Sequence, residues 1–406
     1  MKRALMALLV ASAWWIVTVA QAPVTVFEGA RVIVGDGRAP IENATIVVNG
    51  AKIAQVGRAS DVKAPAGATR VSLTGKTVMP TIVDTHVHTS QEREALTQDM
   101  RRRAYYGVSA AMSLGQDTGE APFQIRAQPI PGAARFFTAG RGITAPEPGR
   151  TDAPYWIQSA DEGRKAVQEL AKQKVDIVKV WVDDRDGKYK KLTPDLYGAV
   201  IDEAHKNKLR VTAHLFTLED AKGLWKAGID AFAHGVRDRD IDEEFLSMVK
   251  KRPAFVLVPN LPDRGVKTDL SWLKASLSAG ELQKLEATNT DRPDAQKQFG
   301  IQARNLAKMS AAGVRVALGS DGNTPWAPHV EMADMVASGM TPMQVIVAAT
   351  RNGAEFLRMS DSGTIEAGKS ADFLVLDANP LDDITNTRRI SSVYLRGVAV
   401  ERKGGS

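Results

Sequence analysis

Residues 78–88 read VMPTIVDTHVH, an apolar run that ends in an acid and two histidines. Side chains two positions apart on a strand point to the same side, so His86 and His88 can bind one cation together. Active sites of parallel β/α barrels lie at the carboxyl ends of their strands. We therefore predict that this stretch is the first strand of such a barrel and that its histidine pair begins a metal site.

Seven further apolar runs follow at intervals that fit a repeating β/α unit. They span residues 108–114, 134–139, 175–182, 210–216, 231–236, 254–261 and 314–319. Helical patterns separate them, as in residues 159–174 and 217–227, and strands that alternate with helices form parallel sheets. Eight such units within about 280 residues predict an α/β fold, a TIM-type (β/α)8 barrel over residues 79–358.

Two β-rich segments flank the predicted barrel. Residues 24–78 contain β-branched runs broken by Asn49-Gly50, a strong hairpin-turn signal, and residues 363–400 have the same character. We predict a small β-sandwich built from both chain ends, residues 23–78 and 359–402. The polar segment 267–298, between the seventh and eighth runs, is either a helical insertion or a mobile lid.

Three more side chains that can bind metal ions lie at the ends of later predicted strands. His214 and His234 end the fifth and sixth, and neutral imidazole is a common ligand of divalent ions. Asp321 follows the eighth, where a carboxylate can bind a metal ion and accept a proton from an attacking water. Together with the histidine pair, these positions predict one shared metal site.

Lys179 lies in the middle of the fourth apolar run, where a buried ammonium is costly unless it is neutralised or paired. Desolvation lowers the pKa of a lysine and makes its amine reactive. Reaction with carbon dioxide would convert the amine into a carbamate, an anionic ligand that can bridge two metal ions. The alternative is an ion pair with Asp183 or Asp321.

The order of these residues along the chain resembles the amidohydrolase superfamily. The approach to the first histidines, residues 78–84, and the stretch GTIEAGKSADFLVLD at residues 363–377 resemble the corresponding parts of that family. The resemblance covers nearly the whole chain after residue 22 and is strongest to the imidazolonepropionase-like and Xaa-Pro dipeptidase-like branch. It implies a metal site composed of His86, His88, Lys179, His214, His234 and Asp321.

By the same resemblance, Lys179 would be carbamylated and Asp321 would be the catalytic proton acceptor. The predicted cofactor is a divalent metal, zinc by preference, at one or two ions per chain. The predicted reaction is hydrolysis of an amide-like C–N bond in a dipeptide, N-acyl amino acid or cyclic amide by a metal-activated hydroxide. Ester, lactone or phosphotriester hydrolysis at the same site is the alternative, and a catalytically silent scaffold is a third interpretation.

Two stretches depart from the family pattern where substrate contacts would lie, residues 139–149 and residues 181–185. These departures do not affect the predicted metal ligands, but the identity of the small-molecule substrate stays open. The candidates for contact with the substrate are Arg141, Trp181, Asn260, Trp326 and His329.

Composition and charge narrow the class of protein further. The chain has 406 residues, no cysteine and a formal charge of +6, with no basic stripe that would indicate a nucleic-acid partner. Residues 1–22 carry Lys2 and Arg3, an apolar run and a small-residue ending, the pattern of a secretory signal peptide. We therefore expect export, periplasmic or secreted, without stable membrane insertion once the segment is removed. A retained anchor is the alternative, and assembly into a homo-oligomer stays open.

Overall fold

The apolar run before His86 forms two strands rather than one. The computed structural model describes residues 24–402, and the predicted signal segment, residues 1–22, lies outside them. β5 (Thr77–Pro80) pairs with strands from the two chain ends, whereas β6 (Ile82–Val87) pairs with the next parallel strand. The partner changes after Pro80, which has no N–H for a ladder hydrogen bond. The histidine pair therefore belongs to β6 and the residue that follows it.

Among the described residues, two sheets consist of parallel strands alone. The three-stranded sheet has the order β6, β7 (Val108–Ser113) and β8 (Arg135–Thr138). The seven-stranded sheet has the order β10 (Tyr155–Trp156), β9 (Ile143–Thr144), β11 (Val178–Val182), β12 (Val211–Leu215), β13 (Ala231–Ala233), β14 (Val256–Val258) and β15 (Arg315–Val316). Each of the eight predicted runs coincides with a strand or a strand pair, so these positions are confirmed.

Backbone hydrogen bonds join the two sheets beside the histidine pair. The N–H of Thr85 donates to Leu318 O (2.9 Å), and the N–H of Asp321 donates to His86 O (2.8 Å). β6 therefore lies next to the segment that follows β15, which brings the last predicted strand beside the first. The one continuous sheet that the sequence predicts is found as two sheets, because the strand ladder is interrupted at two places. Residues 317–322 do not keep regular strand geometry beside β6, and within residues 24–402 no strand pairing joins β8 to the seven-stranded sheet.

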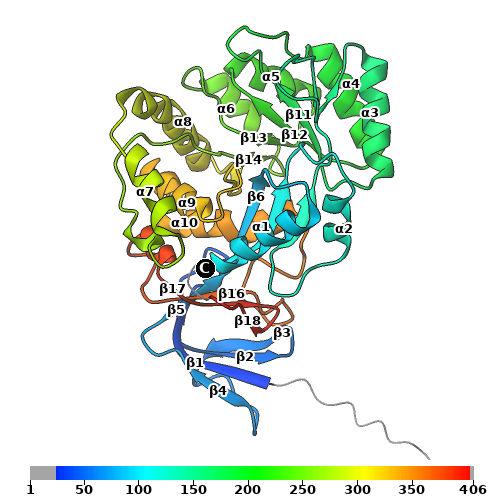
Figure 1. Ribbon diagram of the computed structural model, residues 1–406. Coiled ribbons are helices and arrows are strands. Elements are labelled where there is room, and N and C mark those ends of the chain that lie inside the picture. The colour runs from blue at the N-terminus through cyan, green and yellow to red at the C-terminus, as the bar shows by residue number, and fades with distance from the viewer. Residues whose placement is uncertain (1–23, 403–406) are drawn as a thin grey trace, which may run out of the picture.

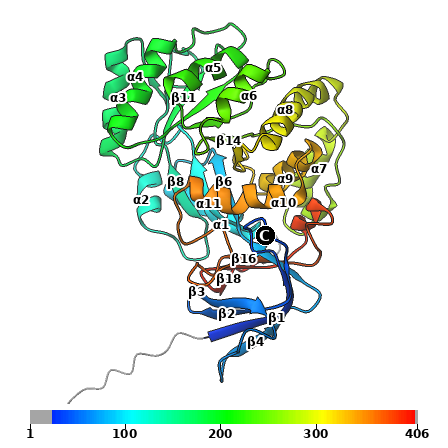
Figure 2. The same cartoon turned by 180° about the vertical axis from the view of Figure 1, so that it is seen from behind.

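Helices cover the outside of the parallel strands (Figures 1 and 2). α3 (Ala160–Lys172) illustrates why they form, since Ser159 and Glu162 make a reciprocal capping box at its start, and Val167 and Leu170 are buried on one face. The other helices are α1 (Arg93–Tyr105), α2 (Ala121–Ala127), α4 (Pro194–Lys206), α5 (Leu218–Ala227), α6 (Glu243–Val249), α7 (Ala279–Thr288), α8 (Pro293–Ala311), α9 (Ala327–Ala337), α10 (Pro342–Val347) and α11 (Gly353–Phe356), with the short helical turns η1 (Ser271–Leu273), η2 (Ala348–Asn352) and η3 (Ile384–Arg388).

Strands from both chain ends share one further sheet, at the bottom of Figure 1. Its order is β18 (Val398–Ala399), β17 (Ile390–Leu395), β16 (Phe373–Leu376), β5, β1 (Val24–Val32), β2 (Ile41–Asn49) and β3 (Lys52–Arg58), with β4 (Thr69–Ser72) paired to β1. The predicted hairpin turn at Asn49 is confirmed, because Asn49 pairs with Lys52 across a two-residue turn.

The predicted sandwich is found as this single sheet. β1 has two register irregularities, and bulges of this kind bend a strand. The bent sheet packs against itself, since the ring centroids of Phe27 on β1 and Phe373 on β16 lie 5.1 Å apart although β5 separates the two strands.

The segment 267–298 is largely helical, which fits the predicted insertion. It contains η1, α7 and the first turns of α8, and Ser278 with Glu281 forms a capping box at the start of α7. Within residues 24–402, no helix is long and apolar enough to cross a membrane.

Candidate metal centre

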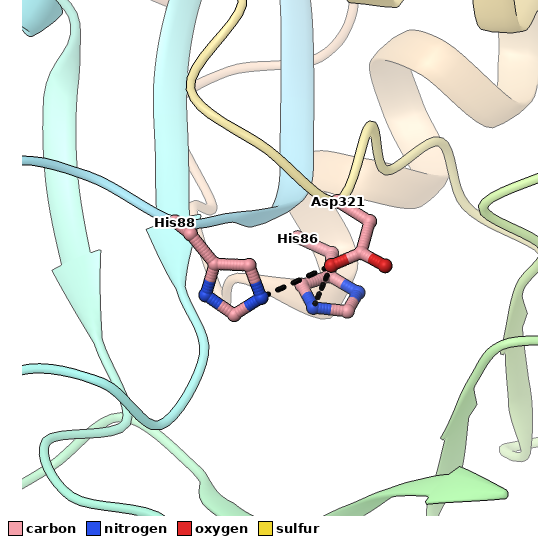
Figure 3. Close-up of side chains that lie close together, drawn as sticks. All are labelled: His86, His88 and Asp321. Atoms are coloured by element: carbon pink, nitrogen blue, oxygen red, sulfur yellow. Dashed lines mark ion pairs between the residues drawn. The ribbon is translucent and has the colours of Figure 1, made fainter. Parts of the chain in front are cut away.

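His86 and His88 lie at the end of β6 and both face Asp321 (Figure 3). The Nε2 atoms of His86 and His88 lie 3.2 Å and 3.0 Å from the same carboxylate oxygen, Oδ1 of Asp321. One ligand atom from each of the three residues lies within 4.8 Å of the others. One cation can span such a set of nitrogen and oxygen atoms. The structure thus brings the predicted histidine pair and the predicted aspartate together.

Asp321 is held in place by its own backbone. Its φ of +50° lies in the left-handed region, which aspartate tolerates better than most residues, and its N–H donates to His86 O. Burial alone would raise the pKa of Asp321, but His86, His88 and His234 hold that pKa well below its usual range. The carboxylate is therefore ionised at neutral pH.

His214 and His234 come from the ends of β12 and β13 and complete a group of four imidazoles. Their ring centroids lie 4.6 Å apart, and those of His234 and His86 lie 5.4 Å apart. The Nε2 atom of His234 lies 3.5 Å from Oδ2 of Asp321. Burial lowers the pKa of His214 to about 3 and the pKa of His86 and His234 well below the ordinary value. All three rings are therefore neutral, the form that binds metal ions.

Lys179 is fully buried on β11, and its Nζ atom has no hydrogen-bond partner within residues 24–402. Burial lowers the pKa of Lys179 to about 7. The ion pair with Asp183 or Asp321 that the sequence left open is absent from the described residues. Instead, Nζ lies 5.4 Å from the ring centroid of Trp181. Lys179 is therefore a buried amine with an unsatisfied polar atom, within electrostatic reach of His86 and His214.

Asp183, one residue after β11, is engaged by His214 rather than by Lys179. Its Oδ2 atom lies 2.7 Å from Nε2 of His214 and 2.7 Å from Nη1 of Arg185. A carboxylate at one nitrogen of an imidazole fixes the orientation of the ring and leaves the other nitrogen available to a metal ion. Asp183 can therefore position His214.

Asn260 contacts one ring nitrogen of His86, as Asp183 does for His214. The amide of Asn260 lies 2.7 Å from Nδ1 of His86, so that Nε2 faces Asp321. Gly319 permits this approach, because a Cβ atom there would lie 2.6 Å from the Asn260 amide oxygen and 2.8 Å from Cβ of His86. Asn260, which the sequence predicted as a substrate contact, is thus placed to orient the imidazole of His86.

A fully buried ion pair holds the loop that carries Asp321. Nη1 of Arg103 lies 3.2 Å from Oδ2 of Asp84, and both side chains are 0% exposed. Asp84 also accepts hydrogen bonds from the hydroxyl and the N–H of Ser320, at 2.6 Å and 3.0 Å, while Arg103 donates to Gly322 O at 2.9 Å. The two residues that flank Asp321 are therefore tied to the core.

The remaining predicted substrate residues occupy different surroundings. The guanidinium of Arg141 donates to the backbone oxygens of residues 152–154, and Trp181 is buried beside Lys179. Trp326 packs against the ring of Tyr106. His329 is fully buried, with its two ring nitrogens 2.9 Å from the backbone oxygen of Tyr106 and 3.1 Å from the hydroxyl of Thr387. Because these partners engage both nitrogens of His329, we assign it no substrate contact.

Sequence reasoning missed Asp84 and Arg103 as supports and Arg185 as a neighbour of His214. Asp84 lies within the quoted stretch 78–88, and its position two residues before His86 was the only available signal. Arg103 is the last of three consecutive arginines, of which it alone is buried, and the sequence does not distinguish them. Arg185 lies in one of the two stretches that depart from the family pattern.

Two characterised relatives are similar in sequence to this chain. Ochratoxinase from Aspergillus niger is 25% identical over 421 residues, covering 90% of this chain and 83% of the relative. Imidazolonepropionase from Streptomyces coelicolor is 26% identical over 358 residues, covering 83% of this chain and 86% of the relative.

The fold itself is found in solved structures. A Xaa-Pro dipeptidase crystallised with methionine in its active site superposes with a TM-score of 0.75 at 23% identity, over 93% of this chain and all of that chain. The model of the amidohydrolase family matches residues 77–400, which include every residue of the centre described above. The chain therefore belongs to the amidohydrolase family and is a hydrolase.

Proposed function

We propose that the protein hydrolyses an amide-like C–N bond of a small molecule at a divalent-metal centre. The proposed ligands are His86, His88, Lys179, His214, His234 and Asp321. One observation carries the proposal, namely that His86, His88 and His234 converge on Asp321 while the unpartnered amine of Lys179 is buried within electrostatic reach of them. We further propose that the two parallel sheets act together as the (β/α)8 barrel expected for this family.

The residues present fit a bound metal ion. Within residues 24–402, His234 Nδ1 and Lys179 Nζ are buried without hydrogen-bond partners, and such atoms each cost about 1–3 kcal/mol when left unsatisfied. Zinc binds well to a donor set of this kind, which consists of neutral imidazoles, a carboxylate and an amine that carbon dioxide can convert into an anionic carbamate. When bound, the ion would supply Lewis acidity toward a water molecule and a substrate carbonyl.

The side chains around that ion divide the remaining work. Asp321 is ionised at neutral pH, so its carboxylate can accept a proton from the attacking water and return it to the leaving nitrogen. Asp183 and Asn260 hold His214 and His86 in orientation. Nitrogen in the leaving group benefits from this return of a proton, because an amide anion is a poor leaving group.

Lys179 supports the proposal through its chemistry. With a pKa of about 7, a large share of its amine is neutral at physiological pH and can attack carbon dioxide. The N–C bond forms as one C=O bond opens, and the nitrogen releases one proton, which leaves an anionic carbamate. That product would carry ligand oxygens into the space where Nζ now has no partner.

Elemental analysis combined with a substrate screen tests the proposal. We expect one or two divalent ions per chain after purification without chelators, and turnover of dipeptides or N-acyl amino acids in preference to lactones and phosphotriesters. Asp321→Asn should keep the fold and most of the metal while turnover falls by about 100-fold or more, and the exposed Asp195→Asn serves as the control. A fully active Asp321→Asn variant would contradict the assigned role.

The carbamate has its own test. Protein prepared with 13C-bicarbonate should show a carbamate carbon signal that disappears in Lys179→Ala and persists in the exposed Lys172→Ala. A metal content of one ion per chain together with full activity of Lys179→Ala would favour a mononuclear centre without a carbamate.

Export is likewise proposed on the pattern of residues 1–22 alone. N-terminal sequencing of the mature protein should find cleavage after Ala20 or Ala22, whereas an intact Met1 in a membrane fraction would favour a retained anchor.

A further inference from the structure

Arg237 carries a guanidinium beside the proposed metal centre that has no hydrogen-bond or ion-pair partner among the described residues. It lies three residues after His234, and its N–H donates to Phe216 O at 2.8 Å, which ties together the loops that follow β12 and β13. Within residues 24–402 its side chain makes no hydrogen bond or ion pair, and Nε is buried without a partner. A partly buried, unpaired cation is costly and calls for an explanation.

Arg185 in the loop after β11 provides an internal comparison. Its Nε lies 3.1 Å from Glu147 and its Nη1 lies 2.7 Å from Asp183, so the protein already compensates its charge. Of its side-chain nitrogens, only Nη2 is buried without a hydrogen-bond partner in the part of the chain that the structure describes. Besides burial, Arg237 and Arg185 both lower the pKa of Lys179 and of His214. Burial lowers the pKa of Arg237 itself, and Asp321 and Asp183 in turn act to raise it, although neither forms an ion pair with it, which places this guanidinium at the proposed centre.

Charge compensation of the metal ligands does not account for Arg237. Asp321 and a carbamate on Lys179 would contribute two negative charges, which one divalent ion already balances and two divalent ions exceed. Asp183 is paired with Arg185 and His214, and Glu147 is paired with Arg185 and Arg150. On this count, no carboxylate of residues 24–402 forms an ion pair with Arg237, so its positive charge at the proposed centre is available to an anion.

We propose that Arg237, assisted by the free Nη2 of Arg185, binds a carboxylate group of the substrate. The enzyme would then act on amide-like substrates that carry a carboxylate close to the scissile C–N bond, as in N-acyl amino acids. This inference rests on the proposed hydrolytic function. The planar guanidinium fork matches a carboxylate with two parallel hydrogen bonds, and such an anchor also orients the substrate toward the attacking water.

Paired substrates that differ only in charge test this assignment. N-acetyl-L-alanine, N-acetyl-L-methionine and N-acetyl-L-phenylalanine are each compared with their C-terminal carboxamides. We expect kcat/KM of the wild type to favour the acids by about 10- to 100-fold, the range for a hydrogen bond to a charged group. Arg237→Met should remove that preference by lowering kcat/KM for the acids alone, and Arg237→Lys should restore part of it. Arg239→Met, at a side chain that is 70% exposed, is the matched control.

Binding and stability separate a substrate contact from a structural role. The metal-loaded Asp321→Asn variant, titrated with N-acetyl-L-methionine by calorimetry, should bind about 10- to 100-fold more weakly once Arg237→Met is added. The Arg237→Met variant should unfold at the same or a higher temperature than wild type, because it removes an unpaired buried charge. A lower Tm, with equal losses for acids and carboxamides, would overturn the assignment.

The outcomes distinguish this inference from the function on which it rests. If the wild type hydrolyses both members of each pair equally and Arg237→Met changes neither, the carboxylate site is refuted while amide hydrolysis stands. If the wild type hydrolyses no amide but calorimetry still shows acid binding that depends on Arg237, the proposed reaction fails and the anion site stands.

Discussion

Arg103→Met tests whether the buried ion pair with Asp84 secures the loop that carries Asp321. Both side chains are 0% exposed, and removing one partner of a buried pair costs roughly 3–5 kcal/mol because it leaves the other charge uncompensated. Asp84 would keep its two hydrogen bonds from Ser320, so we expect the free energy of unfolding to fall by about 3 kcal/mol, the lower end of this range. Turnover should also fall, because Arg103 no longer holds the carbonyl of Gly322 beside Asp321.

Urea unfolding of metal-free protein, followed by tryptophan fluorescence, measures the loss. Arg102→Met is the matched control, since Arg102 is the exposed neighbour on the same helix and should change the free energy of unfolding by less than about 0.5 kcal/mol. The double variant Asp84→Asn/Arg103→Met should cost less than the sum of the two single variants, by about 1–3 kcal/mol. A loss for Arg103→Met within 1 kcal/mol of the control, or strictly additive losses, would refute this account of the pair.

Three further perturbations give expected outcomes. Asp183→Ala should lower metal affinity by about 10- to 100-fold, measured by competition with a chelating dye, because it removes the carboxylate that orients His214; unchanged affinity would exclude that role. Burial raises the pKa of Asp334 to about 6, so the folded state binds this proton more tightly and the stability contributed by protonation is lost as pH rises from about 4 through 6. Wild type should therefore lose up to about 3 kcal/mol relative to Asp334→Asn over that interval in urea titrations, and parallel pH profiles would contradict the assignment. Removal of metal by a chelator should lower Tm, and added zinc should restore it. At a free zinc concentration one hundred times Kd, binding should add about 2.7 kcal/mol to the free energy of unfolding. A Tm that does not change with zinc would argue against a metal site in the folded state.

The sequence was informative wherever a property is local to a short stretch. The alternation of residues 78–88 placed His86 and His88 on one side of β6, and the apolar runs located the strands whose ends carry His214 and His234. The hairpin at Asn49 followed from turn chemistry alone. These features depend on backbone periodicity and steric limits, which a few neighbouring residues determine.

The division of the strands into two sheets and the bent terminal sheet were not predictable in this way. Whether the segment after β15 keeps regular strand geometry depends on how residues 317–322 meet β6, more than two hundred residues earlier in the chain. The bend of β1 likewise depends on its register with β2. Register between distant segments is set by packing, and no local pattern encodes it.

The partners of the charged residues were decided by the tertiary structure alone. From the sequence, Asp183 was a possible partner for Lys179, but the fold pairs it with His214 and Arg185. Among residues 24–402, the amine of Lys179 and the guanidinium of Arg237 have no hydrogen-bond partner. A carboxylate pairs with whichever cation the packed strands bring within hydrogen-bond distance. The sequence by itself therefore determined which residue types gather at the strand ends, because strand alternation is local. Only the tertiary structure decided which of them are paired with one another, because pairing is a property of three-dimensional proximity.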